Sequence, residues 1–407
     1  MTLHMTAIAD MTVAPEPSRA AALACLSRVR PAAYARTRNH LEGAVTGLSP
    51  WLTHGVLTLP EVLAGVLARD PLAVQHKLVF ELGWREYFRH VWAHLGDGIL
   101  RSVHEGPLPE AAYARVLPSD IREARTGVPV IDQAVRELYR TGTLHNHARM
   151  WLASYVVHIR RVHWRAGADW LVAHLFDGDL ASNHLSWQWV AGTGSHKPYL
   201  FNAENVARYA PEAWRSPGSV IDCSYAELDA MARGRAGKTV SSAADGVAGL
   251  AEPALLTEPP ANLGVLAPEV QAAAAAVRDR TVWLVHPWAL RAPPADLPAD
   301  AVVIGVYPRE HHHAWPWPAA RWRWVDAAMR EVCPQRWHID AAALRKALAG
   351  AAAVRCTDDP HLPGAMTGIA HREAPPRLFA PVPRHCTSFS QWWTRVTRGV
   401  TQAGELL

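Results

Sequence analysis

Residues 177–189 bring together polar and aromatic side chains that suit a flat heterocyclic ligand. Their sequence is DGDLASNHLSWQW. The turn at residues 177–179 places a carboxylate at a predicted helix start, where the helix dipole favours negative charge. Asp179, Asn183 and Trp187 then follow at four-residue spacing and share one helical face. That face offers an acceptor, an amide and a large ring. The alternative is an ordinary capped helix that buries its tryptophans.

A second segment, residues 145–150 with the sequence HNHARM, sets a guanidinium among apolar positions. Asn146, Arg149 and Met150 share one helical face. An arginine in apolar surroundings needs an anion. Asp177 is a candidate, and so is a negatively charged reduced ring. A plain structural salt bridge explains the same pattern equally well.

Two further segments place charged or hydroxyl side chains beside apolar helices. Residues 80–88 read FELGWREYF, in which Arg85 and Glu86 interrupt an apolar helix. Buried charges need pairing, so the helix either borders a cleft or hides an ion pair. Residues 46–50, TGLSP, put small hydroxyls ahead of a helix. Such a helix start can hold phosphate, although most bind nothing.

The elements that position these residues are predicted to be helices. Apolar residues recur at three- and four-residue spacing, and Gly, Pro, Ser and Asp breakers separate the segments. The predicted helical segments are 57–67, 78–91, 130–138, 148–159 and 170–176. Residues 19–210 are therefore expected to form an all-helical domain after a frayed start at 1–18. An Ala/Gly/Pro-rich linker is expected at 211–280, with a short helix near 268–277.

Residues 281–407 follow a different pattern and predict a small Rossmann-like α/β domain. The β-branched runs at 281–286, 301–307 and 352–356 suit buried parallel strands, with helices expected at 319–332 and 340–349. No glycine-rich phosphate loop follows these strands, so no nucleotide site is assigned there. The histidines at 311–313 are expected in a surface loop, with metal binding as the weaker alternative.

Composition limits the functional classes. The chain has 407 residues, a formal charge of +4 and 18 tryptophans. The charge permits contact with nucleic acid without arguing for it, and the indoles suit either a core or ring stacking. Five scattered cysteines form no metal-ligand or disulfide pattern, and no apolar run predicts a membrane span. We therefore expect a reduced cytoplasmic protein without a metal or iron–sulfur site.

In this order, the motifs resemble the flavin domain of the photolyase/cryptochrome family. The resemblance covers about residues 34–210 and includes LSPWLTHGVL, FELGWREYF, TGVPVIDQAVREL, LHNHARM and DGDLASNHLSWQW. It implies FAD bound in a U shape. The implied cofactor-binding residues are Tyr34, Thr46, Ser49, Arg149, Asp177, Asp179 and Asn183. Asn183 would face flavin N5, and a neutral amide there would not repel an anionic reduced ring.

The resemblance also implies catalytic and substrate positions. Trp187 and Trp164 match the first two members of an electron-transfer chain, but residues 107–121 hold no tryptophan for the third, so Tyr113 or another indole would serve. The implied lesion-pocket and DNA residues are Arg38, Glu86, Asn146, His147, Met150 and Trp189. Among these, Glu86 and Asn146 would bond to the damaged bases, and Trp189 would stack on them.

Several features depart from the family pattern. His147 and Gly47 stand where basic residues are usual, which weakens contacts with DNA. Asn146 favours a cyclobutane-dimer type over a type that has a second histidine there. The C-terminal region resembles a shortened antenna domain that follows the flavin domain instead of preceding it. Nothing in the sequence identifies an antenna chromophore.

The expected function is blue-light-driven, FAD-dependent repair of pyrimidine dimers in DNA, an activity of the deoxyribodipyrimidine photolyase type. One alternative is a cryptochrome-type photoreceptor that binds FAD, does not repair DNA and signals to a partner. Another is a flavin-binding remnant that assists a second protein.

Overall fold

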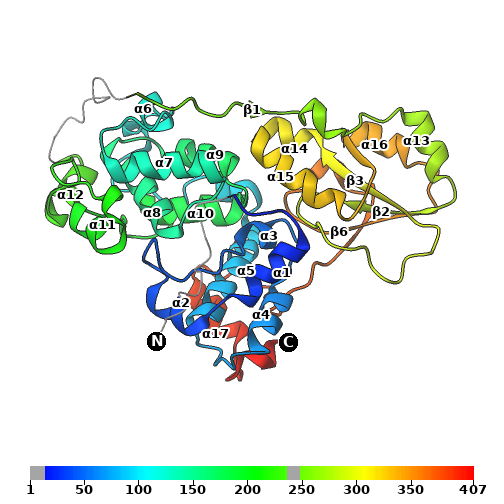
Figure 1. The fold of residues 1–407 in the computed structure, drawn as a ribbon, viewed down its shortest axis with the longest axis horizontal. Helices are drawn as coiled ribbons and strands as arrows, with labels where there is room; N and C mark the ends of the chain where they lie inside the picture. The colour runs from blue at the N-terminus through cyan, green and yellow to red at the C-terminus, as the bar shows by residue number, and fades with distance from the viewer. Residues whose placement is uncertain (1–13, 236–247) are drawn as a thin grey trace, which may run out of the picture.

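The computed structural model describes residues 14–235 and 248–407. Residues 1–13 of the predicted frayed start and 236–247 of the predicted linker lie outside the described residues. The rest forms a helical body and an α/β domain that pack side by side (Figure 1). This arrangement confirms the predicted combination of an all-helical and an α/β fold. None of the described helices is long and apolar enough to span a membrane.

The helical body holds the segments singled out from the sequence. Its helices are α1 (Arg19–Ser27), α2 (Pro31–Thr37), α3 (Ser49–Thr53), α4 (Leu59–Leu67), α5 (Lys77–Leu95), α6 (Ser119–Arg122), α7 (Pro129–Thr141), α8 (Asn146–Ser154), α9 (Trp164–His174), α10 (Leu180–Ala191), α11 (Ala203–Tyr209) and α12 (Tyr225–Ala232). A π-helical turn, η3 (Tyr155–Ile159), follows α8 directly.

Local sequence explains where these helices begin and end. Helix α7 begins with Pro129, which is suited to a helix start because the first residues of a helix make no hydrogen bond through their N–H groups. The helix is followed by Gly142, whose φ of 66° ends it. Helix α10 is capped by Asp179, whose side chain accepts from the N–H of Ser182 at 2.8 Å, and ends at Gly192 with φ 77°. The expected cap at residue 179 is therefore confirmed.

The α/β domain is built on a parallel sheet. Its strands follow the order β5 (Arg336–Ile339), β3 (Val302–Pro308), β2 (Thr281–Val285), β6 (Ala353–Thr357) and β7 (His371–Glu373). Its helices are α13 (Val270–Val277), α14 (Arg309–Ala314), α15 (Ala319–Arg330) and α16 (Ala341–Ala347), while β1 (Leu255–Leu256) pairs antiparallel with β4 (Trp317–Pro318).

The structure differs from the sequence-based description in several places. Helix α12 lies inside the predicted linker and packs against η3. Strands β5 and β7 were not predicted, because both are short and begin with a charged or polar residue. The histidines predicted in a surface loop lie in α14, and His311 and His312 are buried there. That prediction is wrong because residues 311–313 continue a helix that packs on the sheet.

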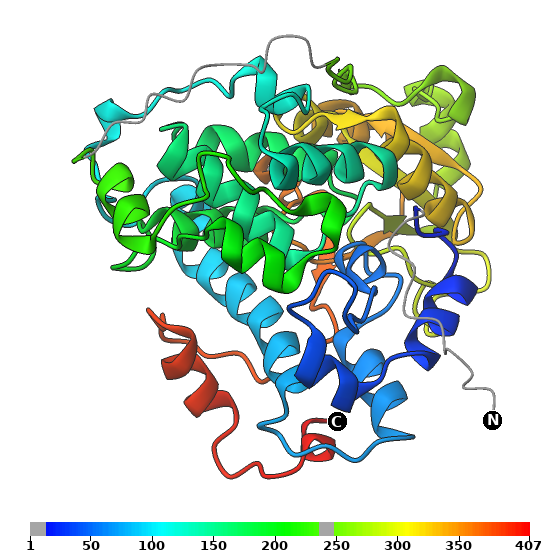
Figure 2. The ribbon, with the colours of Figure 1, turned by 60° about the vertical axis from the view of Figure 1, so that its left-hand side comes forward.

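After β7 the chain returns to the helical body. Helix α17 (Phe389–Val396) packs against α5, followed by a short turn, η7 (Ala403–Leu406), which packs against α4. Figures 1 and 2 show this C-terminal segment, in red, next to the early helices and apart from the sheet. The stacking of Trp84 on Phe389, with ring centroids 4.1 Å apart and 11° between planes, secures the contact. Residues 389–406 thus extend the core of the helical body, although they follow the α/β domain in sequence.

Candidate functional site

A buried ion pair joins two of the segments singled out from the sequence. Nη2 of Arg149, on α8, lies 2.9 Å from both carboxylate oxygens of Asp177, in the turn before α10. The Asp177 side chain is only 3% exposed, whereas that of Arg149 is 26% exposed. The structure therefore confirms the predicted pairing and leaves one side of the guanidinium open.

Ser49 and Arg85 complete this cluster from two other helices. The Ser49 hydroxyl, at the start of α3, donates to Asp177, and Nη2 of Arg85, on α5, donates to Ser49. Tyr34, on α2, is half-buried beside Arg85. Of the predicted phosphate-side residues, Ser49 and Tyr34 therefore lie at the cluster. Arg85, which the sequence marked only as a buried charge, lies at its centre.

The electrostatics of the cluster keep its carboxylate ionised. Burial alone would raise the pKa of Asp177, but Arg149, Ser49 and Arg85 outweigh it and leave the pKa below its ordinary value. Burial lowers the pKa of Arg85, and Asp177 works against that shift. The carboxylate is therefore ionised, and the two guanidiniums around it leave a net positive centre.

Two polar residues of the predicted face of α10, Asp179 and Asn183, are bound by neighbouring helices. Asn183 is buried, and its Nδ2 donates to the carbonyl of Ala168 on α9 at 2.9 Å. That bond fixes the amide and turns Oδ1 away from α9. Asp179 accepts from Nη2 of Arg89 at 2.7 Å in addition to capping its helix. Both side chains are thus held by protein partners.

The backbone conformation of the loop before α3 explains why glycine stands at position 47, where the family usually has a basic residue. Gly47 has φ 67°, in the left-handed region that favours glycine. The hydroxyl of Thr46 accepts from the N–H of Leu48 at 3.4 Å, and its carbonyl lies 3.3 Å from the Cys25 sulfur. The loop conformation therefore calls for glycine at position 47.

Two predicted electron-transfer tryptophans pack within the helical core. Trp187 is 2% exposed, and its ring lies so close to α9 that a Cβ added at Gly167 would be 2.4 Å from it. Trp164, three residues before that glycine, is also buried, and its Nε1 donates to Ser102 at 3.0 Å. The two indoles therefore occupy successive turns along one side of α9.

Two ring contacts lead outward from Trp164. On one side, His163 lies 5.6 Å from Trp164 and 6.3 Å from Tyr113, between ring centroids. On the other, His184 lies 6.2 Å from Trp164 and 5.6 Å from Trp315 of the α/β domain. The sequence had named Tyr113; Trp315 is a second candidate that it did not name.

Several predicted substrate residues share one surface. The imidazole of His147 lies 2.7 Å from the carbonyl oxygen of Asn39 and 3.3 Å from the hydroxyl of Tyr199. Tyr199 in turn packs against Trp189, with centroids 5.6 Å apart. Trp189 is 45% exposed, which is unusual for an indole in this chain. His147 is thus tied to its neighbours, while Trp189 is free to receive a ring.

Polar and flexible side chains border the same surface. Asn146 is exposed at the start of α8, and its Nδ2 lies 3.8 Å from the sulfur of Met150. Arg38 donates to the side chain of Asn39 at 2.6 Å. Because Asn39 also contacts His147, Arg38 and Asn146 lie at neighbouring positions of this face.

Glu86 does not join this face, which corrects its predicted place in the lesion pocket. Its carboxylate accepts from the N–H groups of Leu378 and Phe379 at 2.6 and 3.2 Å. Burial raises its pKa to about 7 despite these bonds. The α5 carboxylate on the substrate side is Glu81, 3.5 Å from Nη2 of Arg38. Positions five apart point in different directions on a helix, so only one can face the surface.

The part of the chain that the structure describes contains no group of three or more His, Cys, Asp or Glu side chains placed to hold a metal. The cysteines in this part form no disulfide with one another, and four of them are buried.

Comparison with known proteins identifies the matching region. A family model described as the FAD binding domain of DNA photolyase matches residues 78–216. The chain is 35% identical over 209 residues to a deoxyribodipyrimidine photo-lyase from Synechococcus sp., covering 47% of this chain and 43% of that protein. It is 32% identical over 203 residues to a chloroplastic/mitochondrial cryptochrome DASH from Oryza sativa subsp. japonica, covering 44% and 34%.

A photo-lyase from Escherichia coli is 31% identical over 195 residues, covering 43% of this chain and 41% of that protein. The chain thus spans less than half the length of these curated relatives. Among solved structures, a Synechocystis sp. cryptochrome is similar, with a TM-score of 0.41 and 30% identity, covering 47% of this chain and 43% of that one.

The residues gathered at the site fit FAD. Two guanidiniums, a hydroxyl and a phenol, from Arg149, Arg85, Ser49 and Tyr34, suit a pyrophosphate and an anionic ring. A fixed buried amide at Asn183 suits a ring nitrogen. The family match identifies residues 78–216 as similar to the FAD binding domain of DNA photolyase, and the chain is similar to photolyases and cryptochromes over somewhat less than half its length.

Proposed function

We propose that this protein uses blue light and FAD to repair pyrimidine dimers in DNA. The observation that supports this most directly is the exposed indole of Trp189 on the surface that Asn146, Met150 and Arg38 border. An indole that is 45% exposed is costly in water and offers a stacking platform for an unstacked base. Arg149, partly exposed on the helix that begins with Asn146, connects this surface with the buried cluster.

When bound and reduced, FAD supplies a light-excited electron that splits the dimer and afterwards returns. The protein provides binding, orientation and electrostatics. Arg149 and Arg85 supply positive charge beside the ionised carboxylate of Asp177. Asn183 contributes a neutral amide, which does not repel negative charge in the cofactor.

Three side chains receive the lesion in this proposal. Trp189 stacks on a flipped-out base, while the Asn146 amide donates to base carbonyl oxygens. Glu81, in place of Glu86, offers a carboxylate to ring N–H groups from the other side of the same face. Arg38 contacts the DNA backbone.

A cryptochrome-type photoreceptor is the second candidate, and two observations favour it. Arg38 is paired with Glu81 and with the side chain of Asn39, so its charge is partly neutralised. His147, the other predicted DNA contact, is held by Asn39 and Tyr199. Both features weaken the attraction for phosphate and leave flavin binding intact.

The deciding experiment is a repair assay on an oligonucleotide that contains one cyclobutane pyrimidine dimer. FAD-loaded, fully reduced protein should remove the dimer under blue light and not in the dark. Trp189→Ala should weaken binding of the damaged strand by about fivefold to 150-fold, because stacking of one base contributes roughly 1–3 kcal/mol.

Tyr225→Ala is the matched control, because Tyr225 is an equally exposed aromatic residue, at 49%, on α12. This variant should bind damaged DNA like the wild type. Photoreduction of bound FAD without any light-dependent loss of dimers would refute repair and favour the photoreceptor.

A further inference from the structure

A charged network crosses from the helical body to the α/β domain beside the flavin helix. Asp179, the N-cap of α10, lies 2.7 Å from Nη2 of Arg89 on α5. Nη1 of the same guanidinium lies 3.0 Å from Asp359, which follows β6 of the α/β domain. Asp359 then pairs with Nδ1 of His361 at 2.7 Å. One arginine therefore joins a predicted flavin residue to the second domain.

His361 returns the connection to α10. Its Nε2 lies 3.2 Å from the backbone N–H of Leu180, the first residue of that helix. An N–H donor on one side and a carboxylate on the other assign the tautomer, with the proton on Nδ1 and the lone pair on Nε2. The first N–H groups of a helix lack partners within the helix. Asp179 caps one of them and His361, from the other domain, caps another.

The imidazole of His361 is fixed on both faces. Trp288, in the loop after β2, stacks on it with centroids 4.7 Å apart and 4° between planes. The Trp92 ring on α5 meets it edge-on, also at 4.7 Å. His361 is 5% exposed, and the stacked indole of Trp288 holds its Nε2 toward Leu180.

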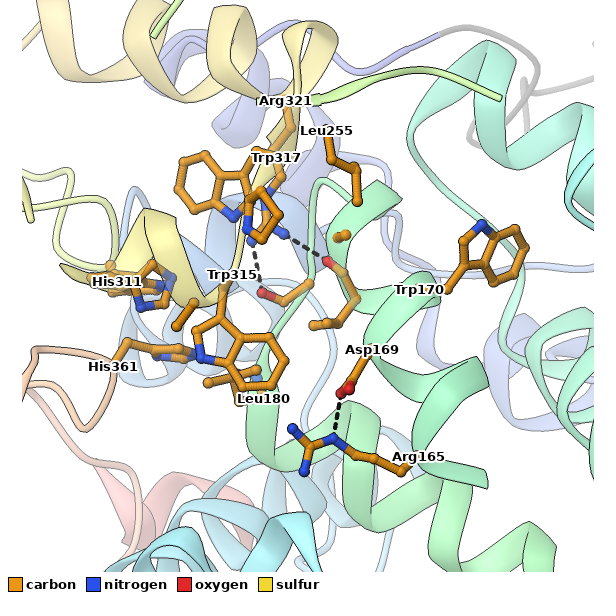
Figure 3. Close-up of a pocket in the computed structure, with 16 residues that line it drawn as sticks. Arg165, Asp169, Trp170, Leu180, Leu255, His311, Trp315, Trp317, Arg321 and His361 are labelled. Atoms are coloured by element: carbon orange, nitrogen blue, oxygen red, sulfur yellow. Dashed lines mark hydrogen bonds and ion pairs between the residues drawn. The ribbon is translucent and has the colours of Figure 1, made fainter. Parts of the chain in front are cut away.

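A second clamp from the α/β domain holds the turn that precedes α10. Arg321, on α15, is buried and donates to the carbonyls of Val172 and Gly178 at 2.7 and 2.8 Å. Arg321, Gly178, Leu180 and His361 are among the residues that line one pocket between the two domains. Figure 3 shows both bonds of Arg321 as dashed lines on one side of this pocket, with His361 and Leu180 on the other. The α/β domain thus holds this turn at two points. Arg321 binds the carbonyl of Gly178, and His361 binds the N–H of Leu180 at the start of α10.

From these contacts we propose that Asp359 and His361 are positioning residues of the flavin site. They hold the first turn of α10, and thereby Asp179 and Asn183, where the cofactor meets them. The inference rests on the flavin roles proposed for Asp179 and Asn183. The α/β domain then forms part of the structural support of the flavin site.

The test uses full-length His361→Leu, His361→Gln and Asp359→Asn. In the FAD-free protein, backbone hydrogen exchange at Leu180 should be about fivefold to tenfold faster in His361→Leu, as expected for the loss of one hydrogen bond. His361→Gln should restore protection, because its amide oxygen can accept from the Leu180 N–H. With FAD bound, His361→Leu and Asp359→Asn should blur the fine structure of the visible flavin band and shift the flavin midpoint potential.

Asp358→Asn is the matched control. This neighbour is about half exposed and pairs with Arg372, away from α10, so it should leave exchange, spectrum and potential unchanged. Wild-type exchange at Leu180 in His361→Leu overturns the inference. Faster exchange at Leu180 with an unchanged flavin spectrum and midpoint potential also overturns it, because loss of the hydrogen bond from Leu180 would then have no effect on the bound flavin. Wild-type protein that takes up no FAD would refute the proposed function itself, and the inference with it.

Discussion

The packing of Trp187 on α9 gives a sharp prediction for Gly167→Ala. The added Cβ would lie 2.4 Å from two carbon atoms of the Trp187 ring and 3.2 Å from a methyl carbon of Val156. Ordinary contacts begin near 3.4 Å, so the indole must move by about 1 Å, the difference between 3.4 and 2.4 Å. Trp187 is only 2% exposed and cannot move into solvent.

Two opposing effects set the magnitude. Alanine is a better helix former than glycine by about 1 kcal/mol, whereas overpacking a tight core costs about 1–3 kcal/mol. We therefore expect Gly167→Ala to lower the free energy of unfolding by up to about 2 kcal/mol. In Gly65→Ala, on α4, the added Cβ meets the flexible end of Leu26, which can yield, so that variant should be neutral or slightly stabilised.

Urea unfolding of both variants measures the difference, provided that the slope of the transition stays the same. Near-ultraviolet circular dichroism reports the moved indole, and photoreduction of bound FAD should slow only in Gly167→Ala. If Gly167→Ala proves as stable as Gly65→Ala and photoreduces normally, Trp187 does not pack on α9 as described, and the reasoning fails.

Two other predictions follow from the site and the core. Photoreduction should depend more on Trp315 than on Tyr113, because burial raises the pKa of Tyr113 and its phenol must lose a proton on oxidation. Stopped-flow spectra of Trp315→Phe and Tyr113→Phe measure the two rates of photoreduction. A larger loss of rate in Tyr113→Phe would contradict the expectation. Burial lowers the pKa of His54, His145, His158 and His338 to about 4 each, so these groups take up protons on unfolding below their ordinary pKa of about 6.5. Through these groups, the free energy of unfolding should fall from pH ~6.5 toward pH ~4 by about 1.4 kcal/mol per pH unit for each proton taken up. Glu86 and Glu137, whose pKa burial raises to about 7, act in the opposite sense and offset part of this fall. Urea midpoints across this range test it, and a flat profile would show that these imidazoles are not buried.

Local patterns predicted much of the site. The carboxylate at position 179 caps α10 because its preference for a helix start depends only on neighbouring residues. Asp177 was one of two candidate partners named for Arg149, since a buried guanidinium needs an anion, and the structure shows that pairing. The spacing of apolar residues distinguished the helical body from the α/β domain, because this spacing also depends only on neighbouring residues.

Contacts between distant segments escaped prediction. Glu86 was placed in the lesion pocket, but its partners are backbone N–H groups near residue 378, which no spacing within α5 reveals. The connection of Arg89 to Asp359 spans the two domains in the same way. A charged residue in an apolar helix shows that a partner exists without showing which segment supplies it.

The contact between α5 and α17 has a consequence for how the protein is made. Phe389 stacks on Trp84, and about 300 residues separate them in sequence. At roughly 5–20 residues per second, a ribosome needs about 15–60 s to synthesise the intervening chain. During that time, Phe80 and Trp84 lack their contacts with Phe389, so this apolar part of α5 is open to aggregation until α17 has been synthesised.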